Sequence, residues 1–229
     1  MPCLADFASR RLPSDFIEKW DAWLQRSIAA SRERLGERWL DVYLTSPMWR
    51  FVLGPGVCGD GAWAGLLVPS VDKVGRYFPL TFAQPLGPRT FDLDAIVSKQ
   101  AWYAELERVA LSALNIDYTV DALEQALAGN RFPSDNAVVG DPRAREIADW
   151  LENSAGTPLN RDFSSSDALV AAMHRTAGLT LGAVARGRSF WWCVEQQSGA
   201  TELHCAPALP DSDYYAVLLG SPVTAGTLQ

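Results

Sequence analysis

The segment from residue 13 to residue 36 constrains the fold most, because its apolar residues recur at the spacing of one helical face. Pro13 and Ser14 form a start signal in which Ser14 is the expected N-cap, and Gly36 ends the pattern. The expected inward positions are Phe16, Trp20, Trp23, Leu24, Ser27, Ile28, Ser31 and Leu35. The segment therefore predicts a long amphipathic helix with one buried face.

Strand character follows this helix. Short apolar runs bounded by turn residues predict five strands, at residues 49–53, 62–68, 77–83, 188–195 and 201–206. A glycine-rich stretch over residues 54–61 separates the first two runs, which favours a hairpin. Further helices are predicted at residues 37–44, 93–114, 121–128 and 166–177, with a last helical turn within 211–219.

The region from about residue 131 to residue 166 is expected to be a variable excursion, because three prolines interrupt it and its apolar periodicity is weak. One or two helical turns are expected within it, and the tail 221–229 is expected to be frayed. The order of elements predicts one α/β domain over residues 1–229. We expect a mixed β-sheet with an antiparallel component and helices packed on it.

Composition excludes several classes of function. The formal net charge of -7 opposes the phosphate contacts on which nucleic-acid binding depends, so no nucleic-acid partner is expected. No window approaches the roughly 20 apolar residues that span a bilayer, and the first residues lack a signal pattern, which predicts a cytoplasmic protein with no membrane partner. Four widely spaced cysteines are expected to be buried free thiols, and no metal or cofactor is predicted.

No set of residues has the pattern of a catalytic site. The glycines of residues 54–61 lead into a strand and lack the following lysine of a phosphate-binding loop. Ser70 could pair with Asp72 and a histidine as a nucleophile, but the small-residue elbow that exposes such a serine is absent. We expect Ser70 and Asp72 to bind backbone amides in a turn instead.

The loop between the second and third predicted strands carries Asp72, Lys73, Gly75 and Arg76. In one interpretation Asp72 and Arg76 form a structural clamp around Gly75; in the other the loop binds a partner, and both roles can coexist. Elsewhere, neighbouring side chains on a strand point to opposite faces, so Trp191 and Trp192 must separate. We expect one inside and the other under a helix or in an interface.

A set of ordered motifs resembles one family. They are Asp6-Phe7, Arg11-Leu12-Pro13, Trp20-Asp-x-Trp23-Leu, Trp39-Leu, Tyr43-Leu-x-Ser-Pro-x-Trp-Arg-Phe51, Gly65-x-x-x-Pro-Ser-x-Asp-x-x-Gly-Arg-Tyr-Phe-Pro-Leu80 and Trp191-Trp192. This pattern is similar to that of the TagF, or ImpM-like, proteins associated with type VI secretion. It is strong over residues 2–85 and loose over 90–229. Two departures are the missing first strand of the family before Pro2, with Ala5 where glycine is usual, and Lys73 where arginine is common.

The resemblance implies a three-layer α/β sandwich with helices on both faces of the sheet. It also implies a cytoplasmic, post-translational regulator of type VI secretion that acts by protein contact, notably with the FHA-domain scaffold protein of the system. Some family members carry a PP2C-type phosphatase domain, which 229 residues do not accommodate beside this one, so phosphatase activity is not expected.

The sequence thus predicts a noncatalytic binding regulator. Its expected partner-binding residues are Ser70, Asp72, Lys73, Arg76, Trp191 and Trp192. Two alternatives stay open: a hydrolase-type enzyme that uses the Ser70–Arg76 loop with a histidine, and a structural subunit of the secretion apparatus.

Overall fold

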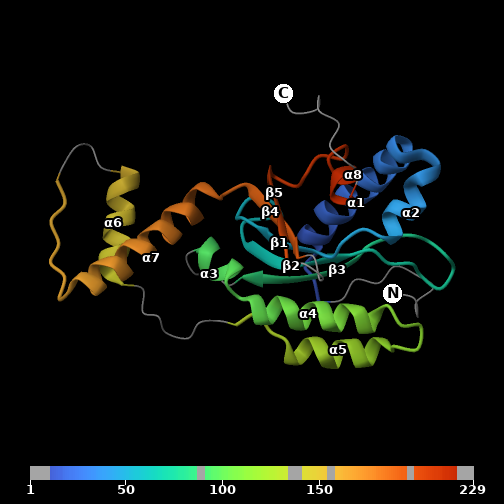
Figure 1. Ribbon diagram of the computed structural model, residues 1–229, viewed down its shortest axis with the longest axis horizontal. Coiled ribbons are helices and arrows are strands. Elements are labelled where there is room, and N and C mark those ends of the chain that lie inside the picture. Colours follow the sequence, from blue (N-terminus) through green and yellow to red (C-terminus); the bar gives the residue numbers. More distant parts are fainter. Residues whose placement is uncertain (1–10, 87–90, 134–140, 154–157, 195–198, 221–229) are drawn as a thin grey trace.

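One five-stranded sheet organises the computed structural model, which describes residues 11–86, 91–133, 141–153, 158–194 and 199–220 (Figure 1). The strand order is β3-β2-β1-β4-β5. The strands are β1 (Trp49–Leu53), β2 (Ala62–Val68), β3 (Leu80–Leu86), β4 (Arg188–Val194) and β5 (Thr201–Pro207). All four pairings between these described strands are antiparallel, which corrects the expected mixed sheet. Three of the four pairings join strands that follow one another along the chain, and β4 returns antiparallel to β1 after the helical region.

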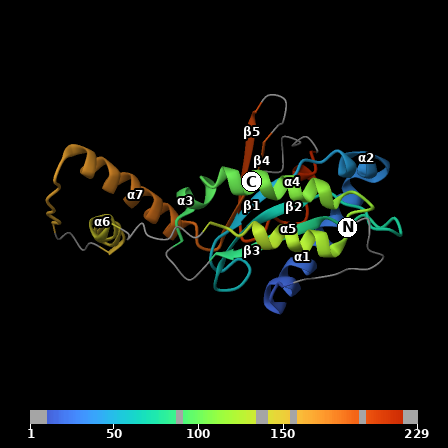
Figure 2. The same cartoon turned by 90° about the horizontal axis from the view of Figure 1, so that it is seen from below.

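Helices cover both faces of this sheet (Figures 1 and 2). The helices are α1 (Ser14–Leu35), α2 (Trp39–Leu44), α3 (Leu93–Val97), α4 (Gln100–Ala113), α5 (Val120–Gly129), α6 (Pro142–Asn153), α7 (Ser166–Val184) and α8 (Tyr215–Leu218). Helices α1, α2 and α8 share one apolar cluster with the sheet, and α3, α4 and α5 share a second cluster on the opposite face. The expected α/β fold with helices on both faces is confirmed.

Helix α1 buries the eight predicted side chains. Its N-cap is Pro13, which corrects the assignment to Ser14, and no side chain caps the helix. The aromatic residues of α1 pack on the sheet, where the Trp20 ring stacks at 5.9 Å on the Trp191 ring. Large aromatic side chains on both elements pack together in this layer, and each buries a large apolar area.

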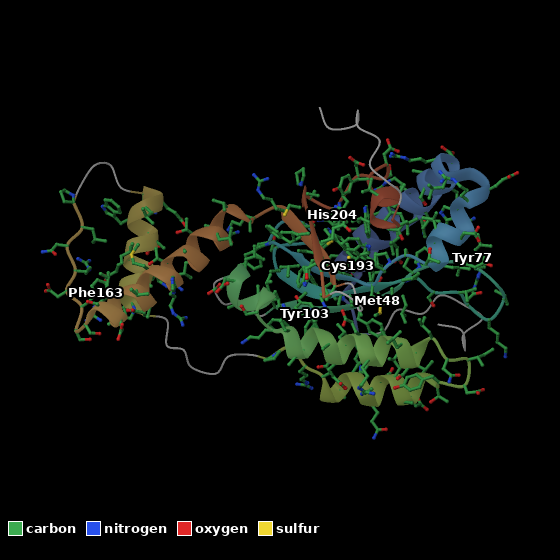
Figure 3. The ribbon with its side chains drawn as sticks, viewed as in Figure 1. Met48, Tyr77, Tyr103, Phe163, Cys193 and His204 are labelled. Carbon is green, nitrogen blue, oxygen red and sulfur yellow. The ribbon has the colours of Figure 1, made fainter. Side chains whose placement is uncertain are left out.

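The second face of the sheet contains a buried ion pair. Arg50 of β1 is 5 % exposed, and its Nε and Nη2 donate to the two carboxylate oxygens of Glu107 on α4, at 2.7 and 2.9 Å. Its Nη1 donates to Gln100 Oε1 at 2.6 Å. Figure 3 shows Tyr103 of α4 pointing toward the sheet, and the Arg50 guanidinium lies 5.5 Å from that ring. These contacts fix the position of α4 on the sheet.

The stretch 131–166 contains more structure than the one or two expected helical turns. Helix α6 lies within it and packs against α7; its Ala144, Ile147, Ala148 and Leu151 recur at helical spacing, and of these only the two alanines are buried. Helix α7 also continues past the predicted end at residue 177, through two glycines that bring it close to another segment. A Cβ on Gly182 would lie 1.8 Å from the carbonyl oxygen of Phe91. These glycines therefore permit close packing and do not end the helix.

Two smaller expectations also change. The single helix expected over residues 93–114 is divided into α3 and α4, and the Asp92 side chain caps α3 by accepting from the Ala95 amide. The third strand is displaced to Leu80–Leu86, and Tyr77 forms only an isolated bridge with Val71. The expectations for residues 1–10, including the missing first strand, and for the tail 221–229 lie outside the described residues.

Candidate functional site

The loop that joins β2 to β3 is closed by its own backbone. Asp72 N donates to Arg76 O at 3.0 Å, and Gly75 N donates to Asp72 O at 3.1 Å. Gly75 has a φ of +83°, which residues with a side chain rarely adopt. Val71 and Tyr77 form a bridge at the base of this turn. The loop is therefore a defined turn that projects a few side chains at fixed positions.

The Asp72 carboxylate organises this turn. Its Oδ1 accepts from the amides of Val74 and Arg76 at 3.0 and 2.8 Å, and its Oδ2 accepts from Arg76 Nε at 2.5 Å. Desolvation opposes ionisation of the carboxyl, but the bonds from Arg76 and Val74 outweigh it and hold the pKa of Asp72 below its ordinary value. The clamp expected from the sequence is present. It also restrains the Arg76 guanidinium, whose side chain is 43 % exposed.

This carboxylate gives the loop a pH dependence that a variant can test. A folded-state pKa below the unfolded value contributes stability at neutral pH, and this contribution is lost as the pH falls through the folded pKa. We expect Asp72→Asn to lower the urea midpoint of unfolding at pH 7 and to differ less from the wild type near pH 3. Lys73→Ala in the same loop is the control, and it should retain the wild-type pH dependence. A constant difference between Asp72→Asn and the wild type from pH 7 to pH 3 would contradict the role given to the carboxylate.

Ser70 anchors the loop and is not part of its surface. The Tyr43 hydroxyl donates to Ser70 O at 2.8 Å and accepts from Ser70 N at 3.0 Å. Burial raises the pKa of Tyr43, so the phenol keeps its proton for this bond. Ser70 is 4 % exposed, and its Oγ has no hydrogen-bond partner among the described residues. Ser70 is therefore removed from the candidate partner-binding residues.

Both tryptophans of β4 are buried. Trp191 is 0 % exposed and packs under α1, whereas Trp192 is 4 % exposed and packs under α4, where its ring lies 5.0 Å from that of Tyr103. The two rings point to opposite faces, as the strand alternation requires. The second ring lies under a helix, which is one of the two arrangements expected from the sequence. The expectation that these residues form a partner-binding surface is therefore corrected: each indole packs in an apolar layer.

An open cleft of about 680 Å³ lies between the loop and the junction of α1 with α2. Its lining includes Arg32, Glu37, Trp39, Leu40, Arg76 and Tyr77. The Arg32 Cζ atom lies 4.3 Å from the centroid of the Trp39 ring. The Tyr77 and Trp39 rings meet edge to face, with their centroids 5.9 Å apart. Figure 3 shows Tyr77 beside α2 at this end of the molecule. The cleft thus combines two exposed guanidinium groups with the half-buried Tyr77 ring, while Trp39 is 6 % exposed and belongs to the core.

The cleft has a different charge from the whole protein. Arg32 and Arg76 line it, against one lining carboxylate, Glu37. The adjoining turn adds exposed Lys73 and the Asp72 carboxylate that pairs with Arg76, which leaves an excess of one positive charge. The complete chain has a formal net charge of -7. A local basic surface on an acidic protein attracts the acidic groups of a partner, whereas the acidic remainder of the protein repels them. Lys73 and Arg76 were identified from the sequence. Arg32 was not, because it is distant from Arg76 along the chain and only the fold brings both residues to one cleft.

The histidines are not joined to Ser70 in the described structure. His204 Nδ1 lies 2.6 Å from the Tyr214 hydroxyl, and its Nε2 lies 2.8 Å from Glu202 Oε1. Figure 3 shows His204 on the sheet edge near α8, away from Tyr77. His174 belongs to α7. Within the described ranges no group of three or more His, Cys, Asp or Glu side chains could hold a metal ion, and none of the helices described has the length and apolarity to cross a membrane.

Comparisons with known proteins extend the resemblance seen in the sequence. Residues 1–129 match the family model described as the TagF N-terminal domain, type VI secretion system-associated. Among solved structures, PA0076 from Pseudomonas aeruginosa PAO1 is 33 % identical with a TM-score of 0.70, over 98 % of this chain and 93 % of that chain. No curated protein matches the sequence significantly. The structural likeness therefore includes the C-terminal part, where the motifs are loose.

Proposed function

The chain belongs to the TagF family of proteins associated with type VI secretion systems, and on that premise we propose that it is a noncatalytic, cytoplasmic regulator. It acts after translation, by binding another protein of the secretion system. The proposed partner is the FHA-domain scaffold protein. The single observation that carries the proposal is the basic cleft beside the Ser70–Tyr77 loop, in which Arg32 and Arg76 are exposed and Tyr77 is half-buried.

The composition of the cleft favours protein recognition. Arginine and tyrosine are enriched at the centres of protein interfaces. Arginine offers many hydrogen-bond donors, and tyrosine buries a large area with few rotatable bonds. Here the Trp39 ring supports the Arg32 guanidinium, and the Asp72 carboxylate restrains Arg76. A side chain held before binding loses less conformational entropy when the complex forms. The surface is thus preorganised for an acidic patch on a partner.

The charge of the cleft predicts how such a complex behaves. Exposed arginines and Lys73 increase the rate of association with an acidic surface, and this contribution is screened by salt. We therefore expect a complex that forms quickly, exchanges freely and weakens as ionic strength rises. Such a complex suits a regulator, whereas a structural subunit is retained in the assembled apparatus.

Purified protein and the purified FHA-domain scaffold from the same bacterium test this function directly. We expect co-elution in size-exclusion chromatography at low salt, and a dissociation constant that rises at least about 10-fold between 50 and 300 mM salt. Deletion of the gene should change type VI secretion without changing transcript levels of the system. A failure of the two proteins to associate at low salt contradicts the partner, and stoichiometric retention in isolated apparatus favours the structural alternative.

A further inference from the structure

The basic cleft contains a carboxylate that limits which anions can bind there. Glu37 lies in the short helical turn Gly36–Arg38, which joins α1 to α2. It is exposed and lines the cleft with Arg32 and Arg76, and it forms no ion pair with any residue that the structure describes. A carboxylate beside two guanidinium groups weakens the attraction for an anion, and the effect increases with the charge of that anion.

The charges around the cleft suit an anion with a single negative charge. Arg32, Arg76 and Lys73 are positive, whereas Glu37 and the Asp72 that pairs with Arg76 are negative, so one positive charge is in excess. One carboxylate group neutralises this excess. A phosphorylated side chain carries about 1.5 to 2 negative charges at pH 7, so it would leave net negative charge beside Glu37. The charge balance therefore favours a carboxylate over a phosphate.

Apolar side chains lie beside these charges. Leu40 lines the cleft and is 37 % exposed, and Leu44, one turn further along α2, is 53 % exposed. Residues four positions apart lie on the same side of a helix, so the two leucines form a continuous apolar edge. Figure 1 shows α2 and the β2–β3 loop at the same end of the molecule. A ligand that places an anionic group in the cleft thus meets apolar surface next to it.

The shape of the cleft suits a short segment of peptide. Gly36 lines one side and Gly75 the other, and a Cβ on either glycine would meet nothing within 4 Å in the described structure. Glycine lets the backbone of a ligand approach closely. The volume of about 680 Å³ lies within the range of roughly 300–1,000 Å³ that is common for ligand sites, and it is far larger than a single ion needs.

We propose that the cleft binds a short, unphosphorylated peptide segment in which an acidic residue stands next to an apolar one. The carboxylate contacts Arg32 and Arg76, and the apolar side chain packs on Leu40. Glu37 determines specificity, because it repels a phosphate more strongly than a carboxylate. This inference rests on the proposed function, since it describes the element of the FHA-domain scaffold that enters the cleft. It implies that the scaffold is bound without being phosphorylated.

Nuclear magnetic resonance titration of the isotope-labelled full chain tests the site without the scaffold. The probes are capped peptides of sequence Gly-Leu-X-Leu-Gly, in which X is aspartate, asparagine or phosphoserine. The aspartate peptide should shift the amide resonances of Gly36 and Gly75, with half-saturation at about 1 mM. The asparagine peptide should bind at least about fivefold more weakly, because it lacks the charge. The phosphoserine peptide should bind no more tightly than the aspartate peptide.

A substitution at Glu37 tests its role in specificity. Glu37→Gln should strengthen binding of the phosphoserine peptide at least about 10-fold and of the aspartate peptide only about threefold, because the phosphate carries more charge. Glu33→Gln is the matched control, since Glu33 is exposed on α1 and does not line the cleft, and it should bind both peptides as the wild type does. Equal gains for the two peptides in Glu37→Gln contradict the role given to this residue.

A substitution at Leu40 tests the apolar contact. Leu40→Ser should weaken binding of the aspartate peptide about fivefold, because apolar area is no longer buried, and should leave the preference between the two anions unchanged. Leu151→Ser is the matched control, since Leu151 is 53 % exposed on α6, and it should bind as the wild type does. Equal affinities of Leu40→Ser and the wild type contradict the apolar contact.

The purified scaffold separates this inference from the proposed function. Phosphatase treatment of the scaffold should leave its affinity for the chain unchanged. If the scaffold binds but the aspartate peptide shifts neither glycine resonance up to about 20 mM, the inference is overturned and the function stands. If the peptide binds as expected and the scaffold does not, the partner is wrong and the recognition of a carboxylate segment stands. Tighter binding of the phosphoserine peptide by the wild type, or lost scaffold affinity after phosphatase treatment, also overturns the inference.

Discussion

Replacing Trp191 with alanine is expected to lower the free energy of unfolding by about 3–5 kcal/mol. The Trp191 side chain is fully buried, and its ring lies 5.9 Å from that of Trp20, 5.4 Å from that of Trp23 and 5.2 Å from that of Phe51. Removal of the indole leaves a cavity between α1 and the sheet that these rigid rings cannot fill. Since small domains are stable by only about 5–15 kcal/mol, the loss is a large share of the total.

Urea unfolding followed by circular dichroism measures this loss. Trp150→Ala is the matched control, because the same substitution is made on α6, where Trp150 is 37 % exposed. The control should cost clearly less than the core variant, about 1–2 kcal/mol at most, because fewer contacts are lost. A loss below about 2 kcal/mol for Trp191→Ala, or equal losses for both variants, would contradict the position of Trp191 in the core.

Much of this core could be predicted from local sequence. The apolar spacing of α1 identified all eight of its buried positions, and the alternation of a strand placed Trp191 and Trp192 on opposite faces. Local patterns failed where small residues carry the packing. Helix α6 has apolar residues at helical spacing, but it buries only its two alanines. Helix α7 continues through glycines that allow close approach and add no apolar side chain to the pattern.

The candidate site likewise has one part that local sequence predicts and one part that it does not. The clamp between Asp72 and Arg76 could be inferred because both residues and the glycine between them lie within one turn. The cleft could not, because Arg32 and Trp39 come from the α1–α2 junction and reach Arg76 only through the tertiary fold. Burial also removed Ser70, which a linear sequence cannot distinguish from its exposed neighbours.

Reversal of the charge at Arg32 is expected to weaken binding of the FHA-domain scaffold more than any other single change in the cleft. Arg32 is exposed and stacks on Trp39, so Arg32→Glu changes the cleft charge by two units without altering the Asp72 clamp. We expect the dissociation constant to rise at least about 30-fold, because a like charge then faces the acidic surface of the partner. Arg26→Glu is the matched control, since Arg26 is exposed on the same helix and does not line the cleft.

Isothermal titration of the scaffold into the wild type, Arg32→Glu and Arg26→Glu tests the central claim most directly. The account predicts a loss of at least about 30-fold for Arg32→Glu and a change within about threefold for Arg26→Glu, with all three proteins equally folded. Unchanged affinity for Arg32→Glu, or equal losses in both variants, would contradict the assignment of partner binding to this cleft.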